Sequence, residues 1–483
     1  MPTWLLGGAL SGAMAALVGG YWDDAWHTER GRDSFFIAPH IAIYAGVTLT
    51  GAALAMWVLR AALERGVRGV VTDGPLVLAG IGVAATLASA PVDNAWHIAF
   101  GRDAVLWSPP HLLGIVGMFA LASALLVQAT DSWRRVGVAV AGGVVFAAAN
   151  FVVVEYDTDV PQFAVTWYLP ALTAATAVAF AVVDMATRSR WAVSAAAAAH
   201  IGLVLGVAAF LELLGFVGPA LPLLIGSAVV YDVGRRRGWS PTALAGAVTA
   251  AVYVVYVPVR NELGSGVALD STTVLTGAPV AFGSAWLVLR TARPGPSLRP
   301  RLRPVGVAAA LTALLLGSVR PEAAFAHDPG QGPAAPSVAL TVSVSDAVAS
   351  VSATSPHLAT GTLGPRGLAA RRAGVTVRAP LERRGGGLSG RIRLPEPGRW
   401  FVYVELIRDD EPIEAWLPVK ATRRPTSVAD PERYAYVASA PASSAIKYLS
   451  GAMVYSAATA LLAGALVVLR RRPEADPPVA SAA

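Results

Sequence analysis

The sequence predicts a polytopic α-helical membrane protein, with about 12 spans and one small extracytoplasmic antiparallel β-sandwich domain near the C-terminus. Three observations predict this fold class. Of the 483 residues, 55% are hydrophobic and only 14% are charged, whereas roughly a quarter of the residues in a soluble domain are charged. Apolar stretches of about 20 residues, long enough to cross a bilayer, recur along most of the chain. A polar segment near the C-terminus instead shows the short alternating runs of β-strands.

Basic residues between the apolar stretches predict the orientation of the spans. The first stretch, TWLLGGALSGAMAALVGGYW, lacks the basic start of a signal peptide, so we expect it to be retained as a span. Arginines cluster after every even-numbered span, which by the positive-inside rule places both termini in the cytoplasm of a plasma-membrane protein. The connections from odd to even spans then face outside. The predicted spans are 3–22, 36–62, 75–99, 109–129, 136–154, 163–184, 191–213, 217–234, 241–260, 272–291, 304–319 and 447–469.

The segment 320–444 has a different composition. Runs such as VALTVSVSDAVASVSATSP and GRWFVYVEL alternate or are rich in β-branched and aromatic residues, and Gly and Pro separate them. This pattern is typical of a small antiparallel β-sandwich of roughly 90 residues. Linkers rich in Pro, Ala and Ser flank it, and its place between the last two predicted spans puts it on the extracytoplasmic side.

Composition also excludes several classes of function. The chain has no cysteine, which removes disulfides and thiolate metal sites. The net charge of +7 comes from arginines in short loops between spans, so it indicates the lipid bilayer as a partner and no nucleic acid. The sequence has no Walker loop, dinucleotide-binding glycine fingerprint or HExxH motif, which argues against NTP-driven transport and zinc proteolysis.

One polar motif occurs twice between apolar stretches. DDAWHTERGRDSFFIAPH begins at Asp23, and DNAWHIAFGRDAVLWSPPH begins at Asp93. Four of the seven histidines lie in these two stretches. We interpret the repeat as two adjacent metal sites, built from the same helix–turn–helix unit by internal duplication. The candidate ligands are Asp23, His27 and His40 in the first copy, and Asp93, His97 and His111 in the second.

The spacing within each copy suits a metal ion. Asp23 and His27 are four residues apart, so on a helix both side chains lie on one face. His40 follows a turn, at the start of the next span, and can fold back to complete the set. Two imidazoles and one carboxylate suit copper(II), zinc or non-haem iron and leave coordination positions open. The absence of a thiolate ligand argues against a blue-copper electron-transfer site.

The GRD triplet in each copy is expected to end a helix in a turn. Its charged residues, Arg32 and Asp33 and then Arg102 and Asp103, are candidates for orienting the metal ligands through hydrogen bonds. A structural alternative is that the aspartates and histidines pair with Arg30 and with these arginines, and only give the helices polar ends.

The motif Asp-x3-His-x12-His, followed by a second set with a slightly longer final gap, resembles the C subunit of the copper membrane monooxygenases, the family of particulate methane monooxygenase and ammonia monooxygenase. The run RDSFFIAPHIAIYAG also resembles that subunit between its histidines, and the resemblance covers about 20–125. It implies that the first Asp/His/His set matches the family's first metal site in this subunit and the second set its neighbouring site. The family's second site begins with Asn, whereas Asp93 here adds a negative charge that favours cation binding.

The resemblance also implies a function. Copper would be the cofactor, and the chain would act with other membrane subunits or as a homo-oligomer, a trimer in the family. A copper-dependent membrane oxidoreductase, or its metal-bearing subunit, would activate dioxygen near the outer leaflet, where small apolar substrates dissolve. The alternative is copper transport or homeostasis without catalysis, with Glu212 or His200 passing the ion inward. The sequence identifies no catalytic residue.

Polar residues outside the repeat offer weaker candidates. His327 follows AFA, a pattern typical of signal-peptidase cleavage, which would expose it as an N-terminal copper ligand that His357 could join. The alternative is that both histidines are solvated in an intact chain. The acidic residues of two loops are expected to be solvated charges, or else to steer cations towards the metal sites: Glu155, Asp157, Asp159, Glu262 and Asp270.

These predictions divide the chain into four parts. Residues 1–130 form a metal-binding four-helix membrane unit, and residues 131–319 form further transmembrane helices. Residues 320–444 form the extracytoplasmic β-sandwich with its linkers, and residues 445–483 form the last transmembrane helix and a cytoplasmic tail.

Overall fold

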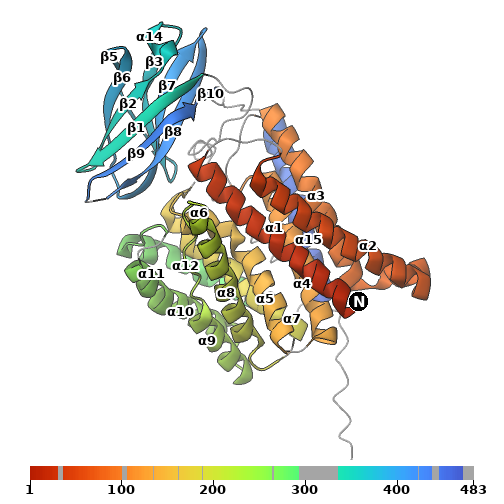
Figure 1. The fold of residues 1–483 in the computed structure, drawn as a ribbon. Helices are drawn as coiled ribbons and strands as arrows, with labels where there is room; N and C mark the ends of the chain where they lie inside the picture. Colours follow the sequence, from red (N-terminus) through yellow and green to blue (C-terminus); the bar gives the residue numbers. More distant parts are fainter. Residues whose placement is uncertain are drawn as a thin grey trace, which may run out of the picture.

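A computed structural model shows a helical bundle with a β-domain against one end (Figure 1). It describes residues 1–30, 36–100, 106–133, 135–161, 163–187, 189–263, 266–292, 336–422, 424–437 and 445–470. Within these ranges, the side chains of 94, 97–100, 132, 445–447 and 470 are not described.

The first four helices form two hairpins, one for each copy of the motif. In each hairpin the aspartate of the motif lies near the end of the first helix, and the last histidine lies in the first turn of the second. The final helix of the chain packs against the second hairpin. These helices are α1 (Thr3–Glu29), α2 (Ala38–Thr72), α3 (Gly74–Phe100), α4 (Pro109–Ser132) and α15 (Ala445–Arg470).

Matching glycines let both hairpins pack closely. A Cβ atom on Gly12 would lie 2.6 Å from the carbonyl oxygen of Gly46, and one on Gly82 would lie 2.8 Å from the carbonyl oxygen of Gly117. The offset that superposes the motif copies, 70 residues on the first helix and 71 on the second, also carries Gly12 onto Gly82 and Gly46 onto Gly117. The repeat therefore extends to the packing surfaces, as expected if a whole helical hairpin was duplicated.

We expect Gly12→Ala to destabilise the first hairpin by about 1–3 kcal/mol, the usual cost of overpacking, because its Cβ atom would lie 2.4 Å from Thr50 Oγ1. Gly8 is the matched control, since it lies one turn earlier in the same helix and a Cβ atom there meets nothing within 4 Å. Gly8→Ala should be neutral, or stabilise by up to about 1 kcal/mol through helix propensity. Thermal unfolding in detergent compares the two variants, and equal midpoints would contradict the close packing.

The remaining helices coincide with most of the predicted spans. In the described part of the chain, ten helical segments are long and apolar enough to cross a membrane. The helices that follow the first hairpins are α5 (Arg135–Asn150), α6 (Val154–Asp157), α7 (Tyr168–Thr187), α8 (Ala192–Leu213), α9 (Ile225–Arg236), α10 (Pro241–Ala251), α11 (Val257–Leu263) and α12 (Ser271–Ala292). Short helical turns join some of them, at η1 (Phe151–Val153), η2 (Val165–Trp167) and η3 (Val252–Tyr256).

The predicted span at 217–234 was only partly right. Residues 216–223 are not helical. The helix α9 begins at Ile225 and has 12 residues, or about 18 Å, well short of the roughly 30 Å of a bilayer core. Pro219 and Pro222 account for the difference, because proline lacks the N–H that a helix interior needs. The predicted span at 304–319 lies outside the described residues.

The C-terminal domain confirms the predicted antiparallel β-structure. Two five-stranded sheets, in the orders β5-β6-β2-β1-β9 and β10-β8-β7-β3-β4, face each other across a core that includes Val342, Leu388, Trp400 and Leu417. Burial alternates along β1, as it should in a strand with one face on the core. The strands are β1 (Ser337–Ser345), β2 (Val348–Thr354), β3 (Gly364–Arg372), β4 (Val375–Ala379), β5 (Glu382–Arg384), β6 (Gly387–Arg393), β7 (Gly398–Arg408), β8 (Glu411–Ala421), β9 (Thr426–Tyr434) and β10 (Tyr436–Val437), with one short helix, α14 (Pro356–Ala359).

Charged contacts around Asp159 hold the β-domain against the bundle. Arg372 Nη2 donates to Asp159 Oδ1 at 2.7 Å, and the backbone N–H of Arg399 donates to Asp159 Oδ2 at 3.0 Å. The Arg399 side chain also pairs with the carboxylate of Glu29, and Arg433 donates to the carbonyl oxygen of Glu29 at 3.1 Å. The β-domain therefore docks on the end of α1 and on the loop after α6 (Figure 1).

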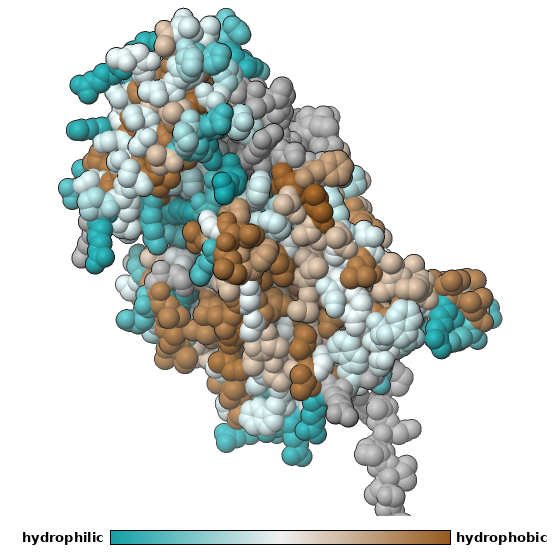
Figure 2. Space-filling view, in the orientation of Figure 1, coloured by the Kyte–Doolittle hydropathy of each residue, from teal (hydrophilic) through white to brown (hydrophobic). Residues whose placement is uncertain are grey.

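The two parts of the molecule have different surfaces. Figure 2 shows hydrophobic residues gathered over the helices and hydrophilic residues over the β-domain. Large apolar side chains such as Leu63, Val254 and Leu275 are more than 70% exposed on the helices. Apolar surface of this extent is expected of helices that face lipid.

Candidate metal centre

The first motif copy brings three metal-binding side chains together at the joined ends of α1 and α2. Asp23 and His27 lie one turn apart near the end of α1, and His40 lies in the first turn of α2. Pro39 also lies in that turn, where its fixed φ angle suits the start of a helix. Asp23 Oδ1 lies 3.4 Å from His27 Nε2 and 3.0 Å from His40 Nε2. The predicted grouping of Asp23, His27 and His40 is thus present.

The distances in this group suit one shared metal ion. The three ligand atoms lie within 4.8 Å of one another. Two ligands at 2.0–2.1 Å from a tetrahedral ion are about 3.3 Å apart, close to both distances from Asp23. The three side chains are between 18% and 24% exposed. An ion there would be partly shielded and still reachable from outside the bundle.

The second copy has the same arrangement where the structure describes it. Asp93 Oδ1 lies 3.3 Å from His111 Nε2, across the joined ends of α3 and α4. His97 follows Asp93 by one turn in α3, but its side chain is outside the described residues. Two of the three predicted ligands of the second site are therefore shown to meet.

Neighbouring charges around the first group contact other partners. The Arg30 guanidinium lies over the Phe216 ring, 5.6 Å from its centroid. Thr158 donates to Asp24 Oδ2 at 3.5 Å. Among the described residues, the ionic contacts of Asp23 are with the two histidines, so the alternative pairing with Arg30 is not what the structure shows. The predicted orienting residues Arg32, Asp33, Arg102 and Asp103 lie outside the described residues.

The other predicted histidines do not join a metal group in the described chain. His357 lies in α14 on the β-domain, exposed, with Nδ1 3.4 Å from Thr362 Oγ1. His327 lies outside the described residues. His200 is buried in α8 beside the Phe146 ring, and neither of its ring nitrogens has a hydrogen-bond partner among the described residues.

The prediction of solvated charges is confirmed at Glu262 and Asp270, which are exposed, and was wrong at Glu155, Asp157 and Asp159. Glu155 is 4% exposed and accepts from the backbone N–H of Leu106 at 3.0 Å. Asp157 accepts from the Tyr168 hydroxyl at 2.7 Å, and Asp159 is 8% exposed in its contacts with the β-domain. These carboxylates are buried because their segment runs between the bundle and the β-domain.

One signal in the sequence pointed to this buried network. Arg260 interrupts the apolar run YVVYVPVRNEL, and a charge at that depth needs a partner. In the structure Arg260 is 1% exposed, lies over the Tyr168 ring at 4.7 Å and approaches Asp157 Oδ1 at 3.9 Å. The acidic residues of the segment 155–159 were candidate partners for this charge.

Comparison of the chain with protein-family models, with curated proteins and with solved structures found no match. The resemblance to the monooxygenase C subunit therefore stays a prediction that rests on the Asp/His/His motifs.

Proposed function

We propose that the protein binds copper at Asp23, His27 and His40 and serves as the metal-bearing part of an oxygen-activating membrane oxidoreductase, in the manner of the C subunit that it resembles. The observation that supports this most directly is the shared carboxylate oxygen, Asp23 Oδ1, within 3.4 Å of two imidazole nitrogens.

The donor set favours copper among the metals that fit. In the usual order of affinities among divalent first-row metals, copper(II) binds most tightly to a set of two imidazoles and one carboxylate. Copper held by three protein ligands would supply open coordination positions and one-electron chemistry with dioxygen. In this proposal the Asp23 carboxylate lowers the net charge of the centre, and the helix positions of His27 and His40 fix the directions of their rings.

The second copy gives the proposal a neighbouring site of the same composition. Asp93 and His111 already meet at 3.3 Å, and His97 lies at the matching position of α3. In a trimer or a complex with other membrane subunits, such sites would lie at the same level of each bundle. We place this level, and the β-domain next to it, on the extracytoplasmic side because the basic loops lie at the opposite ends of the helices.

The transport alternative lacks a supporting observation. A route inward through His200 would need polar neighbours, yet the Phe146 ring lies beside it and its nitrogens have no partner among the described residues. Glu212 is exposed on α8, twelve residues away. We therefore favour the copper-dependent oxidoreductase over the copper transporter.

Loading the purified full chain with copper(II) tests the proposal. We expect about one tightly bound copper for each complete motif, with a nitrogen-coupled electron paramagnetic resonance signal, and loss of about one copper in His27→Ala. His357→Ala is the matched control, because that exposed histidine lies on the β-domain, and it should leave the copper content unchanged. Copper loss in both variants, or none bound by the wild type, would overturn the metal site.

Dioxygen consumption separates the two functions. With copper loaded, a two-electron reductant and a small apolar substrate in the membrane, we expect oxygen uptake that His27→Ala abolishes. One oxygen atom would enter the substrate and the other would leave as water with the two electrons and two protons. Copper entry into sealed vesicles without oxygen uptake would instead support copper transport.

A further inference from the structure

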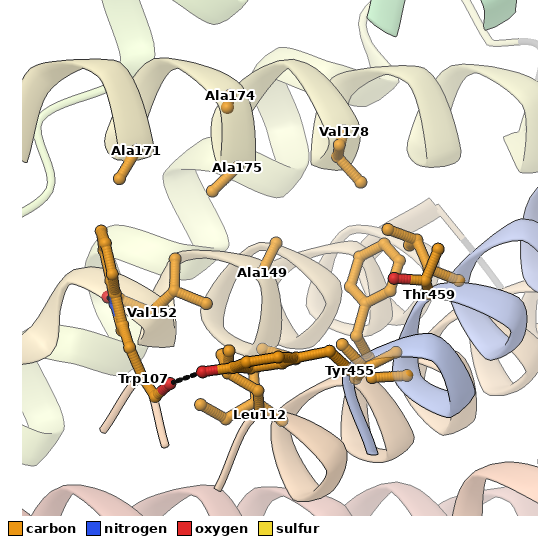
Figure 3. Close-up of a pocket in the computed structure, with 16 residues that line it drawn as sticks. Trp107, Leu112, Ala149, Val152, Ala171, Ala174, Ala175, Val178, Tyr455 and Thr459 are labelled. Carbon is orange, nitrogen blue, oxygen red and sulfur yellow. Dashed lines mark hydrogen bonds between the residues drawn. The ribbon is translucent and has the colours of Figure 1, made fainter. Parts of the chain in front are cut away.

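An apolar cavity of about 120 Å³ lies inside the bundle, between α4, α5, α7 and α15 (Figure 3). Its walls include Phe119 on α4, Val152 after α5, Ala175 on α7, and Tyr455 and Leu462 on α15. Its volume approaches that of the roughly 150 Å³ apolar cavity that binds benzene or xenon in an engineered protein. The space is therefore large enough for a ring or for a short piece of aliphatic chain.

Small side chains on facing helices leave this space open. Helix α7 presents Ala171, Ala174 and Ala175 to the cavity, and α15 presents Ala458. Figure 3 shows these α7 alanines across the cavity from Leu112 and Tyr455. Close packing is the rule in protein interiors, so a space kept open by four alanines is one that another molecule can fill.

The polar groups at one end of the cavity form hydrogen bonds within the protein. The Tyr455 hydroxyl donates to the carbonyl oxygen of Trp107 at 2.8 Å, and Trp107 Nε1 donates to the carbonyl oxygen of Val152 at 2.6 Å. With these groups bonded to the protein, the cavity offers little to water, which needs two to four polar partners. The occupant that suits it is a hydrocarbon.

The shape and position of the cavity favour a chain over a compact molecule. Along α4 its wall runs from Leu112 to Phe119, which is about 10 Å at 1.5 Å per residue. That distance begins at the end of α4 next to His111 and continues towards the middle of the helix. All four walls belong to segments that are long and apolar enough to cross a membrane, and of these α15 is the least buried inside the protein. A phospholipid acyl chain would therefore approach the cavity along α15.

We infer that this cavity binds the end of one phospholipid acyl chain from the leaflet next to the metal centre. The acyl chain would fill the space between α7 and α15 and complete the packing of α15 against α4. This site is independent of the metal, and no step of the proposed oxidation depends on it.

Native mass spectrometry of the full-length protein, reconstituted with a phospholipid of one defined mass and washed with detergent, tests the inference. We expect the wild type to retain one more phospholipid per chain than Ala175→Phe, which fills the cavity. Leu275→Phe, on an α12 side chain that is 72% exposed, is the matched control and should retain the same lipid as the wild type. Equal lipid retention in wild type and Ala175→Phe would overturn the inference.

A second measurement serves if the bulky variant does not fold. In vesicles of phosphatidylcholine brominated along one acyl chain, quenching of Trp107 is obtained as the difference between wild type and Trp107→Phe. We expect it to exceed the average quenching of the other tryptophans. Xenon binding to the detergent-washed protein, together with no excess quenching, would show that the cavity takes only small free molecules, and would contradict a bound chain.

Discussion

Asp23→Ala is expected to remove copper from the first site and to weaken its binding by more than about 100-fold. Changes to residues that only support metal ligands typically cost 10–100-fold in affinity, and Asp23 provides the oxygen that both His27 and His40 approach. Without that carboxylate, two neutral imidazoles on different helices would have to hold the ion alone. Competition with a copper chelator of known affinity measures the change.

Asp24→Asn is the matched control for this prediction. Asp24 is the next residue of α1, and its described hydrogen bond is to Thr158, away from the histidines. The control changes the neighbouring carboxylate in the same helix turn and should bind copper within a few-fold of the wild type. A loss as large as that of Asp23→Ala would mean that the local charge, and not ligation by Asp23, determines the binding.

Asp159→Ala is expected to destabilise the docked β-domain by about 3–5 kcal/mol, the usual cost of leaving one partner of a buried ion pair alone. Arg372 is 4% exposed, and both oxygens of Asp159 accept hydrogen bonds from the domain. Removing the carboxylate would leave the Arg372 guanidinium buried with carbonyl oxygens only. Thermal unfolding, and protease cleavage of the connection before α15, should both report the loss.

Asp346→Ala controls for the backbone at the same time. Asp346 and Asp159 both have positive φ angles, 50° and 60°, where alanine is less favourable than aspartate. Asp346 is exposed in the turn between β1 and β2, on the surface of the β-domain. It should cost about 1 kcal/mol or less. Similar destabilisation by both changes would assign the effect to backbone conformation and not to docking.

Much of the fold could be predicted from the sequence because membrane helices and alternating strands have strong local signals. The four-residue spacing of Asp23 and His27 was sufficient to put both on one face, and the start of the next predicted span at His40 was sufficient to expect it near them. The same alignment, carried further along the helices, would also have found the Gly12/Gly82 and Gly46/Gly117 matches.

The remaining features depend on conformation or on distant contacts. Hydropathy measures composition, so it predicted a full span at 217–234 although Pro219 and Pro222 keep its first part out of a helix. The burial of Asp159 depends on Arg372, which lies 213 residues further along the chain. No local pattern identifies such a partner, and an acidic loop without one is expected to be solvated.

The short connection between β10 and α15 has a consequence for how the β-domain stays in place. Seven residues, 438–444, separate the two elements, and a chain of that length spans at most about 25 Å. The β-domain is therefore tethered close to its docking surface on the bundle. Each rebinding of the domain to that surface is intramolecular, at an effective concentration on the order of millimolar. Contacts that would be too weak to join two separate proteins can then keep the β-domain docked on the bundle almost all of the time. A brief release would move it only a short way before it returns.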